Sequence, residues 1–310
     1  MKKSIRPRLI LLFYYLKPII PRKIQLFIRQ KVARILRAFH KNDWPINYQI
    51  KDLPENWESW PEGKQFALVL RHDVESLRGI SNIWNLVEME AAMGFKSSFN
   101  FSPERYEVKK ELIVEIKKRG FEVGLHGLLH DGKLYSTKKE FHKRAMRINQ
   151  YLKDWDINGF VSPSSHHNLE WICDFNILYD SSTFDTDPFE PQNDSYNSIF
   201  PFFYKSENTG KKVIELPYTL PQDLTLFTIL KEKTINIWKE KIDWIVENNG
   251  MVLLNTHPDY MDFGNESKKK CMYPYTFYRE LLVYIKTKYK DQYIHYLPCE
   301  IALFWKNKYE

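Results

Sequence analysis

The stretch FALVLRHDVES, residues 66 to 76, joins a short apolar run to a polar segment. A run of this length and composition is typical of a strand that is buried on both faces, as in a parallel sheet. His72 and Asp73 stand where the run stops, and Glu75 follows two positions later. In barrels of parallel strands the active site lies at the carboxyl ends of the strands, so these side chains are candidates for chemistry.

Runs of the same kind recur along the chain and alternate with helical patterns. The other predicted strands are residues 97–101, 121–125, 157–162, 176–180, 212–217 and 250–256, with 293–297 as a further candidate. The predicted helices are residues 79–93, 107–119, 137–154, 168–175, 231–248 and 274–289. This alternation predicts β-α units in one parallel, barrel-like domain. The alternation of strands and helices is interrupted at residues 181–211 and 258–272. We expect these two segments to form long loops beside a site.

The positive charge of the chain is concentrated at its N-terminus. Twelve of the 46 Lys and Arg residues fall in residues 1 to 41, which contain no Asp or Glu, so the remaining 34 face 39 acidic residues. A nucleic-acid footprint is normally built into the folded domain, and we therefore expect no nucleic acid ligand. The three cysteines lack disulfide or metal-site spacing, which favours a reducing compartment and a cytoplasmic location.

Residues 1–45 are predicted to be a basic helical extension, and residues 46–310 the barrel domain. The apolar run LILLFYYL, residues 9 to 16, is far shorter than the ~20 residues of a membrane-spanning helix. Residues 22 to 41 place apolar side chains at helical spacing with basic residues between them. Such a helix either lies on an anionic membrane surface, here the inner membrane face, or packs its apolar side on the main domain.

Two histidines follow the strand predicted at residues 121 to 125. His126 and His130 lie four positions apart in GLHGLLHDG, and a helical turn or a compact loop flanked by glycines would bring both imidazoles together. With Asp73 at the end of a neighbouring strand, they make a set of three ligands that leaves a cation an open position. The sequence therefore predicts a catalytic metal site of the zinc type at Asp73, His126 and His130.

His257 ends the last strong strand, in the stretch NTHPDY at residues 255 to 260. An imidazole pKa near 6.5 is close to a neutral working pH, so His257 is a candidate proton donor to a leaving group, with Asp259 to orient it. The alternative is a polar residue that only caps the end of the strand.

The order of these motifs resembles the polysaccharide deacetylase, or NodB-homology, family of carbohydrate esterases. The resemblance covers roughly residues 64 to 300 and rests on Asp73, GLHGLLH, GFVSP (159–163), YDSS (179–182) and NTHPDY. It implies a distorted (β/α)7 barrel and a divalent metal, usually zinc, that hydrolyses N-acetyl groups on sugars. It also implies that Asp73, His126 and His130 bind the metal and that His257 is the catalytic acid.

Two positions depart from the pattern of this family. His72 stands where the family usually has an aspartate base, and Val161 stands where it usually has the arginine that pairs with that base. We interpret His72 as a replacement base or an extra metal ligand. The alternatives are that His72 only hydrogen-bonds Glu75 or a loop carbonyl, and that the base is lost altogether.

Further side chains are candidates for binding the sugar. They are Ser162, Pro163 and His166 in SPSSHHN, and Asp180 and Asp185 in the loop at residues 179 to 192. Carboxylates bind sugar hydroxyls and aromatic rings stack on sugar faces. The alternative for both segments is a solvated loop. The segment ELPYTLPQD, residues 215 to 223, is a further candidate for this wall.

We therefore expect a metal-dependent deacetylase acting on an N-acetylated sugar of a surface polysaccharide or its lipid-linked precursor. The expected partners are the acetylated oligo- or polysaccharide and, through residues 1–41, an anionic membrane surface. The alternatives are a catalytically inactive glycan-binding module and an O-acetyl sugar esterase on the same barrel.

Overall fold

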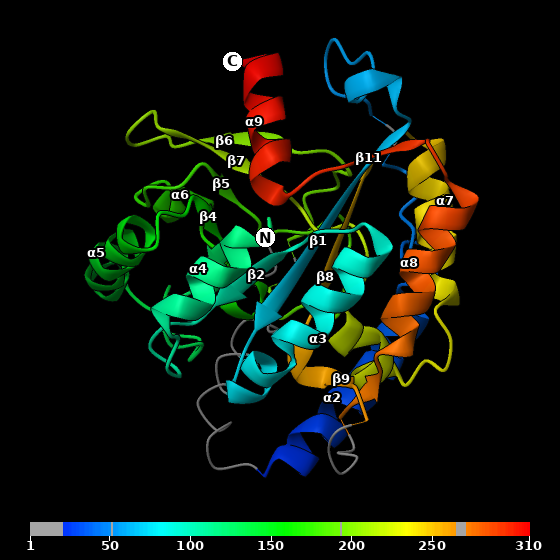
Figure 1. Cartoon of the computed structure of the whole chain (residues 1–310), viewed down its shortest axis with the longest axis horizontal. Coiled ribbons are helices and arrows are strands. Elements are labelled where there is room, and N and C mark those ends of the chain that lie inside the picture. The colour runs from blue at the N-terminus through cyan, green and yellow to red at the C-terminus, as the bar shows by residue number, and fades with distance from the viewer. Residues whose placement is uncertain (1–20, 51, 193, 265–270) are drawn as a thin grey trace.

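The computed structural model describes residues 21–50, 52–192, 194–264 and 271–310 (Figure 1). The first 20 residues of the predicted N-terminal extension lie outside this part of the chain. The main sheet contains β1 (Phe66–Val74), β2 (Ser98–Phe101), β3 (Glu122–Leu125), β4 (Gly159–Phe160), β5 (Tyr179–Asp180), β6 (Phe202–Lys205), β7 (Lys212–Glu215), β8 (Met251–Thr256) and β11 (Tyr293–His295). A separate pair is formed by β9 (Met261–Asp262) and β10 (Tyr273–Pro274).

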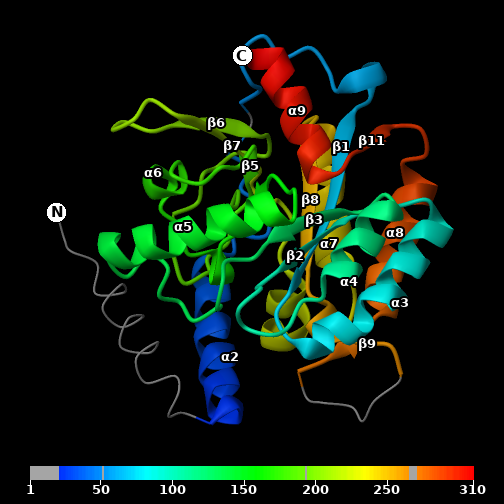
Figure 2. The same ribbon diagram turned by 60° about the vertical axis from the view of Figure 1, so that its left-hand side comes forward.

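The helices lie mostly outside the curled sheet (Figures 1 and 2). They are α2 (Arg22–Phe39), α3 (Leu77–Met93), α4 (Lys110–Lys118), α5 (Lys138–Asp154), α6 (Leu169–Ile172), α7 (Asn236–Glu247), α8 (Thr276–Lys288) and α9 (Pro298–Tyr309). Short helical segments are η1 (Pro61–Gly63), η2 (Pro163–Ser165), the π-helical η3 (Leu224–Leu230) and η4 (Pro258–Tyr260).

The sheet curls into a distorted barrel around β1. One edge of β1 pairs with β8, and the other pairs with β11 at its start and β2 at its end. The parallel order continues through β3, β4, β5 and β7, and β6 adds an antiparallel edge to β7. Beyond β7, the N–H groups of Thr219 and Leu220 donate to the carbonyl of Leu253 in β8, at 3.0 and 3.2 Å. The ring β8–β1–β2–β3–β4–β5–β7 confirms the predicted (β/α)7 barrel.

Each predicted strand and helix of the barrel is present, with shifted ends. Strand β1, predicted at residues 66–71, continues three residues further, to Val74. The strands predicted at residues 157–162 and 176–180 are only two residues long. The sequence did not indicate β6, which lies inside a predicted loop, or α9, which begins at Pro298. Trp44 and Ile46 are both buried in the hydrophobic core. The predicted domain boundary at residue 45 stays a prediction.

The two ends of the barrel are closed differently. At the amino ends of the strands, α9 packs with an aromatic cluster in which Trp57 contacts Trp60 and Phe200, with ring centroids 4.8 and 4.9 Å apart. The arrow of β1 points to the opposite end, where α2 lies (Figures 1 and 2). The carboxyl ends of the strands, where chemistry is expected, therefore face α2.

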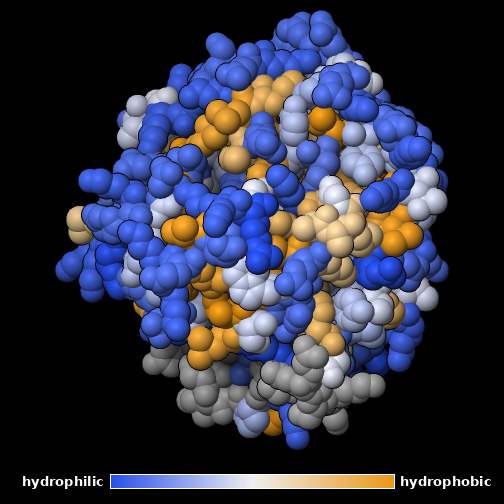
Figure 3. Space-filling view, in the orientation of Figure 1, coloured by the Kyte–Doolittle hydropathy of each residue, from blue (hydrophilic) through white to orange (hydrophobic). Residues whose placement is uncertain are grey.

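Hydrophobic side chains on the face seen in Figure 3 lie in separate patches among hydrophilic ones. Among the described helices, none is both long and apolar enough to cross a membrane.

Candidate metal centre and active site

A cavity of about 820 Å³ opens at the carboxyl ends of the barrel strands. Its wall combines residues from strand ends, from the loop after β3 and from helix α2. The residues with metal-binding or acid-base side chains in this wall include Asp73, Glu75, His126, His130 and His257. The structure thus brings four of the predicted site residues, Asp73, His126, His130 and His257, to one cavity.

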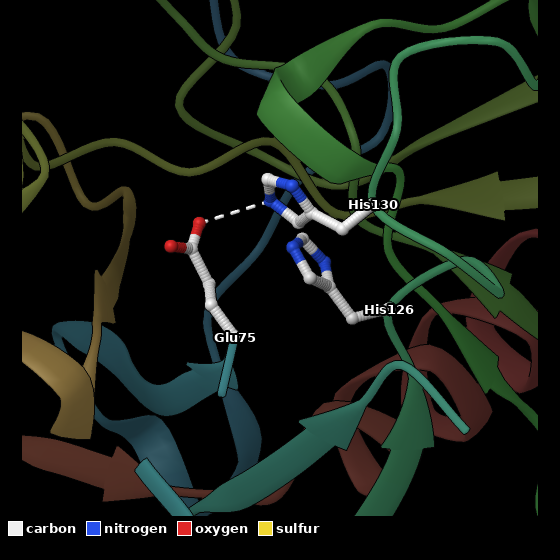
Figure 4. A group of neighbouring side chains, drawn as sticks. All are labelled: Glu75, His126 and His130. Atoms are coloured by element: carbon white, nitrogen blue, oxygen red, sulfur yellow. Dashed lines mark ion pairs between the residues drawn. The ribbon is translucent and has the colours of Figure 1, made fainter. Parts of the chain in front are cut away.

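Three side chains in this cavity form a compact group of possible metal ligands. Ligand atoms of Glu75, His126 and His130 all lie within 4.8 Å of one another (Figure 4). The Nε2 atom of His130 lies 2.9 Å from Oε1 of Glu75 but lacks the alignment of a hydrogen bond. Both ring nitrogens of His126 are buried without a hydrogen-bond partner. Buried polar atoms are normally satisfied, and two imidazoles with one carboxylate are zinc ligands, so the residues fit a divalent cation.

The third side chain of this group is Glu75, whereas the sequence predicted Asp73. Asp73 lies deeper, where Oδ1 accepts a hydrogen bond from Asn100 at 2.9 Å and Oδ2 accepts one from Asn255 at 2.8 Å. Its Oδ2 atom is 3.8 Å from Nδ1 of His126. Asp73 is therefore a neighbour of the compact group and is not among the three residues whose ligand atoms all lie within 4.8 Å of one another.

Asp73 is an ionised carboxylate at the floor of the cavity. Burial disfavours this charge, but the charges of His126 and of Arg71, on the same strand, outweigh burial and lower the pKa of Asp73 to about 2. The arginine that the family pattern places at position 161 is absent, and Val161 is a buried apolar side chain. Arg71 supplies a positive charge from another position.

Residues of η4, which follows β8, hold Glu75 in place. Tyr260 donates a hydrogen bond to Oε2 of Glu75 at 2.8 Å, and the N–H of Glu75 donates to Asp259 at 2.8 Å. The segment η4 approaches α3 closely at Gly79, where a Cβ atom would lie 2.3 Å from Oδ2 of Asp259. Burial opposes ionisation of Glu75, but the charge of His130 and those of His257 and His126 outweigh burial and hold its pKa well below the usual value.

His126 and His130 are positioned by a compact loop and not by a helical turn. Gly127 has a φ of +62° and lies so close to Pro163 that a Cβ atom would be 2.6 Å from the proline ring. His130 itself adopts a φ of +51°, a left-handed backbone that is rare outside glycine. Arg144 of α5 then anchors the loop through two hydrogen bonds to Asp131, at 2.7 and 2.9 Å.

His257 lines the same cavity and is held by Asp223. Its Nδ1 atom is 2.7 Å from Oδ1 of Asp223, and its backbone N–H donates to Oδ2 of Asp223 at 2.8 Å. Burial lowers the pKa of an imidazole, but the charge and hydrogen bond of Asp223 outweigh burial and raise the pKa of His257 to about 10. Asp259, the predicted orienting residue, holds the backbone of Glu75 instead.

His72 points away from the cavity, contrary to the interpretation that it is a base or metal ligand. It is 0% exposed, with Nε2 2.8 Å from Oε1 of Glu90 on α3 and Nδ1 2.7 Å from Oγ1 of Thr256. Successive side chains of a strand point to opposite faces, so His72 faces the helices while Asp73 faces the barrel interior. Both ring nitrogens of His72 are engaged in a structural network.

Replacing His72 with Leu is therefore expected to lower stability without removing the catalytic groups. Removing the imidazole is expected to cost about 3–5 kcal/mol, because the carboxylate of Glu90 then stays buried without this hydrogen-bond partner. We expect a lower thermal midpoint in the variant and recovery of part of the loss when Glu90→Gln is added. Unchanged stability with abolished turnover would instead support a direct role for His72 in the reaction.

The predicted sugar-binding residues occupy three different places. Ser162 lines the cavity. Pro163 and His166 line a small neighbouring hollow. Asp180 and Asp185 are buried and do not reach the cavity: Asp180 accepts a hydrogen bond from Ser182 at 2.7 Å, and Asp185 pairs with Lys241 at 2.5 Å. The interpretation of these two carboxylates as a substrate wall is wrong, since both side chains are buried and neither lines the cavity.

Other residues of that segment and of the stretch at 215 to 223 do reach the cavity. Glu190 and Gln222 line it, joined by a hydrogen bond of 2.8 Å. The hydroxyl of Tyr218 is placed to donate a hydrogen bond to either Glu190 or Asp187. Burial and the neighbouring charge of Glu190 raise the pKa of Asp187 to about 8. The sequence indicated both segments as a possible wall and, in the first of them, counted Asp187 and Glu190 among the carboxylates.

Solved structures share the fold of this chain. One is assigned as a polysaccharide deacetylase from Mycobacterium smegmatis, with a TM-score of 0.63 and 17% identity over 81% of this chain and 93% of that one. The chain has the NodB-homology deacetylase fold. Another structure with this fold is Puue allantoinase, with a TM-score of 0.64 and 14% identity over 86% of this chain and 99% of that one.

A third structure is assigned as a polysaccharide deacetylase from Pseudomonas aeruginosa, with a TM-score of 0.62 and 14% identity over 81% of this chain and 94% of that one. No family model matches the sequence, and no curated protein matches it. At these identities the likeness establishes the fold, and function has to be argued from the site.

Proposed function

We propose that this protein is a metal-dependent hydrolase that removes acetyl groups from N-acetylated sugars of a surface polysaccharide or its lipid-linked precursor. The observation that carries the proposal is the convergence of Glu75, His126 and His130 in the cavity, which His257, held by Asp223, also lines. Two of the structures with this fold are assigned as polysaccharide deacetylases, which supports the choice of substrate.

Glu75, His126 and His130 would hold the cation, most suitably zinc, which when bound polarises the acetyl carbonyl and lowers the pKa of a water molecule. The protein's own side chains move the protons. Asp73, fixed by two amides, accepts a proton from the attacking water. His257, protonated at neutral pH, donates a proton to the departing amine nitrogen.

Acetate release from N-acetylhexosamine oligomers tests this proposal. We expect one new amino group for each acetate, loss of activity after dialysis against a chelator and recovery with zinc. Acetate release from O-acetylated sugars alone, without new amines, would indicate the esterase. Binding of the oligomers without acetate release from any acetylated sugar would indicate the inactive module. The proposed location is cytoplasmic, beside the site where such precursors are assembled.

A further inference from the structure

Helix α2 attaches to the barrel through one side only. On this side Gln25 and Ala33 are buried, and the helix packs against η3. Gln30 donates a hydrogen bond to the carbonyl of Thr228 at 3.0 Å, and Arg37 pairs with Glu232 at 2.5 Å. These contacts fix the rotation of the helix about its own axis. They therefore determine which side chains its other side exposes to solvent.

The other side of α2 presents apolar side chains to solvent. Their exposure ranges from 39% for Ile28 to 81% for Phe39, and the set is Ile24, Phe27, Ile28, Val32, Ile35 and Phe39. We call these six residues the outer stripe. The sequence left open whether this apolar side packs on the main domain, and the structure shows that the helix packs through its opposite side instead. On α4, α5 and α8 the large exposed hydrophobics are single residues, Val114, Met146 and Val283. Single exposed hydrophobic residues are normal on a protein surface, whereas a continuous apolar stripe marks an interaction site.

The charge around the outer stripe indicates what covers it. Lys23, Lys31 and Arg34 are exposed on the same helix, and residues 1 to 41 contain no acidic residue. A second copy of the helix would bring like charges together. An anionic lipid surface matches both properties, because it accepts apolar side chains at the acyl boundary and attracts lysine and arginine.

We propose that α2 docks on an anionic bilayer surface through the outer stripe. The inner side of the same helix forms part of the cavity wall, through Gln25 and Arg29. The cavity and the bilayer would then lie on opposite sides of one helix, about 10 Å apart. If the proposed deacetylase function holds, the substrate is a glycan anchored in the bilayer, whose first sugars reach the cavity while its lipid stays in the membrane.

Binding to vesicles tests the docking independently of any activity. The full chain is expected to float with phosphatidylcholine vesicles that contain phosphatidylglycerol, and not with phosphatidylcholine alone. The triple substitution Ile28→Ser, Val32→Ser and Ile35→Ser should weaken this binding by at least about 100-fold. Lys31→Gln with Arg34→Gln should weaken it about 30-fold. The matched control, Val114→Ser with Met146→Ser and Val283→Ser, removes three exposed hydrophobics elsewhere and should bind normally.

Three results would overturn the proposal. They are absence of binding by the wild-type chain, equal binding by the stripe variant, and conversion of a dimer to a monomer by the stripe variant without any vesicle binding. The last result would assign the stripe to a second copy of the chain.

The substrate class is tested with the same sugar in two forms. A long-chain alkyl N-acetylglucosaminide embedded in anionic vesicles should lose its acetyl group faster than the soluble methyl N-acetylglucosaminide. The stripe variant should lose this advantage and keep its rate on the methyl glycoside. Equal rates on both forms, in wild type and variant, would overturn the membrane-anchored substrate while leaving the deacetylase intact. No acetate release from either form, with normal vesicle binding, would overturn the deacetylase and with it the substrate class.

Discussion

Glu75→Gln is expected to lower acetate release by at least about 1000-fold and zinc affinity by at least about 100-fold. A glutamine side chain carries no charge, so the cation would keep only the two imidazoles as strong ligands. Loss of even an outer partner of a metal ligand costs 10- to 100-fold in affinity, and loss of a direct ligand costs more. Zinc content after gel filtration and the rate of acetate release measure the two effects in one preparation.

Asp73→Asn is the matched control, since Asp73 is the adjacent inward-facing carboxylate of the same segment. This variant should keep its zinc and lose about 10²- to 10⁴-fold in turnover, the range for removal of a general base. The reverse pattern, with zinc lost from Asp73→Asn and retained by Glu75→Gln, would restore the original prediction that Asp73 is the ligand.

His257→Gln is expected to reduce turnover by about 10²- to 10⁴-fold while zinc binding is unchanged, because His257 is assigned to proton donation. The loss should be smaller for substrates with a better leaving group, such as an acetylated sugar linked through an activated phenol. An equal loss on both substrates would argue against protonation of the leaving group by His257.

The pH profile of Asp223→Asn separates the acid role of His257 from a structural one. The pKa of His257 is raised to about 10 in the folded protein, so its donor form persists through neutral pH and is lost as pH rises through the folded pKa. A divalent cation nearby opposes this charge, and the alkaline limb should therefore lie below 10. Removing the charge of Asp223 should move the limb further down, toward the ordinary imidazole pKa near 6.5. An unmoved alkaline limb would contradict the assignment.

The sequence predicted the barrel because parallel strands buried on both faces give continuous apolar runs, and these runs are easily seen. It predicted His126 and His130 because the two histidines share one short loop. It did not identify Glu75, since the apolar run suggested that β1 ends at residue 71, whereas the strand continues to Val74. With the longer strand, the alternation of side chains places Asp73 inward and His72 toward the helices. Glu75 is then the first residue after the end of the strand.

The sequence pattern could not predict contacts between segments that are distant along the chain. Asp223 holds His257 from 34 positions away, and neither charge nor spacing in its own segment points to that partner. The helical periodicity of residues 22 to 41 correctly indicated an amphipathic helix. It could not show which side packs, because packing of α2 is decided by polar contacts such as Gln30 to Thr228 and Arg37 to Glu232.

X-ray data collected on both sides of the zinc absorption edge, from crystals grown with zinc, test the three-residue metal centre most directly. We expect one anomalous peak in the cavity, about 2.0–2.2 Å from a carboxylate oxygen of Glu75 and from one ring nitrogen each of His126 and His130. A peak coordinated by Asp73 in place of Glu75, or no peak in the cavity with zinc in excess, would contradict the metal centre described for this protein.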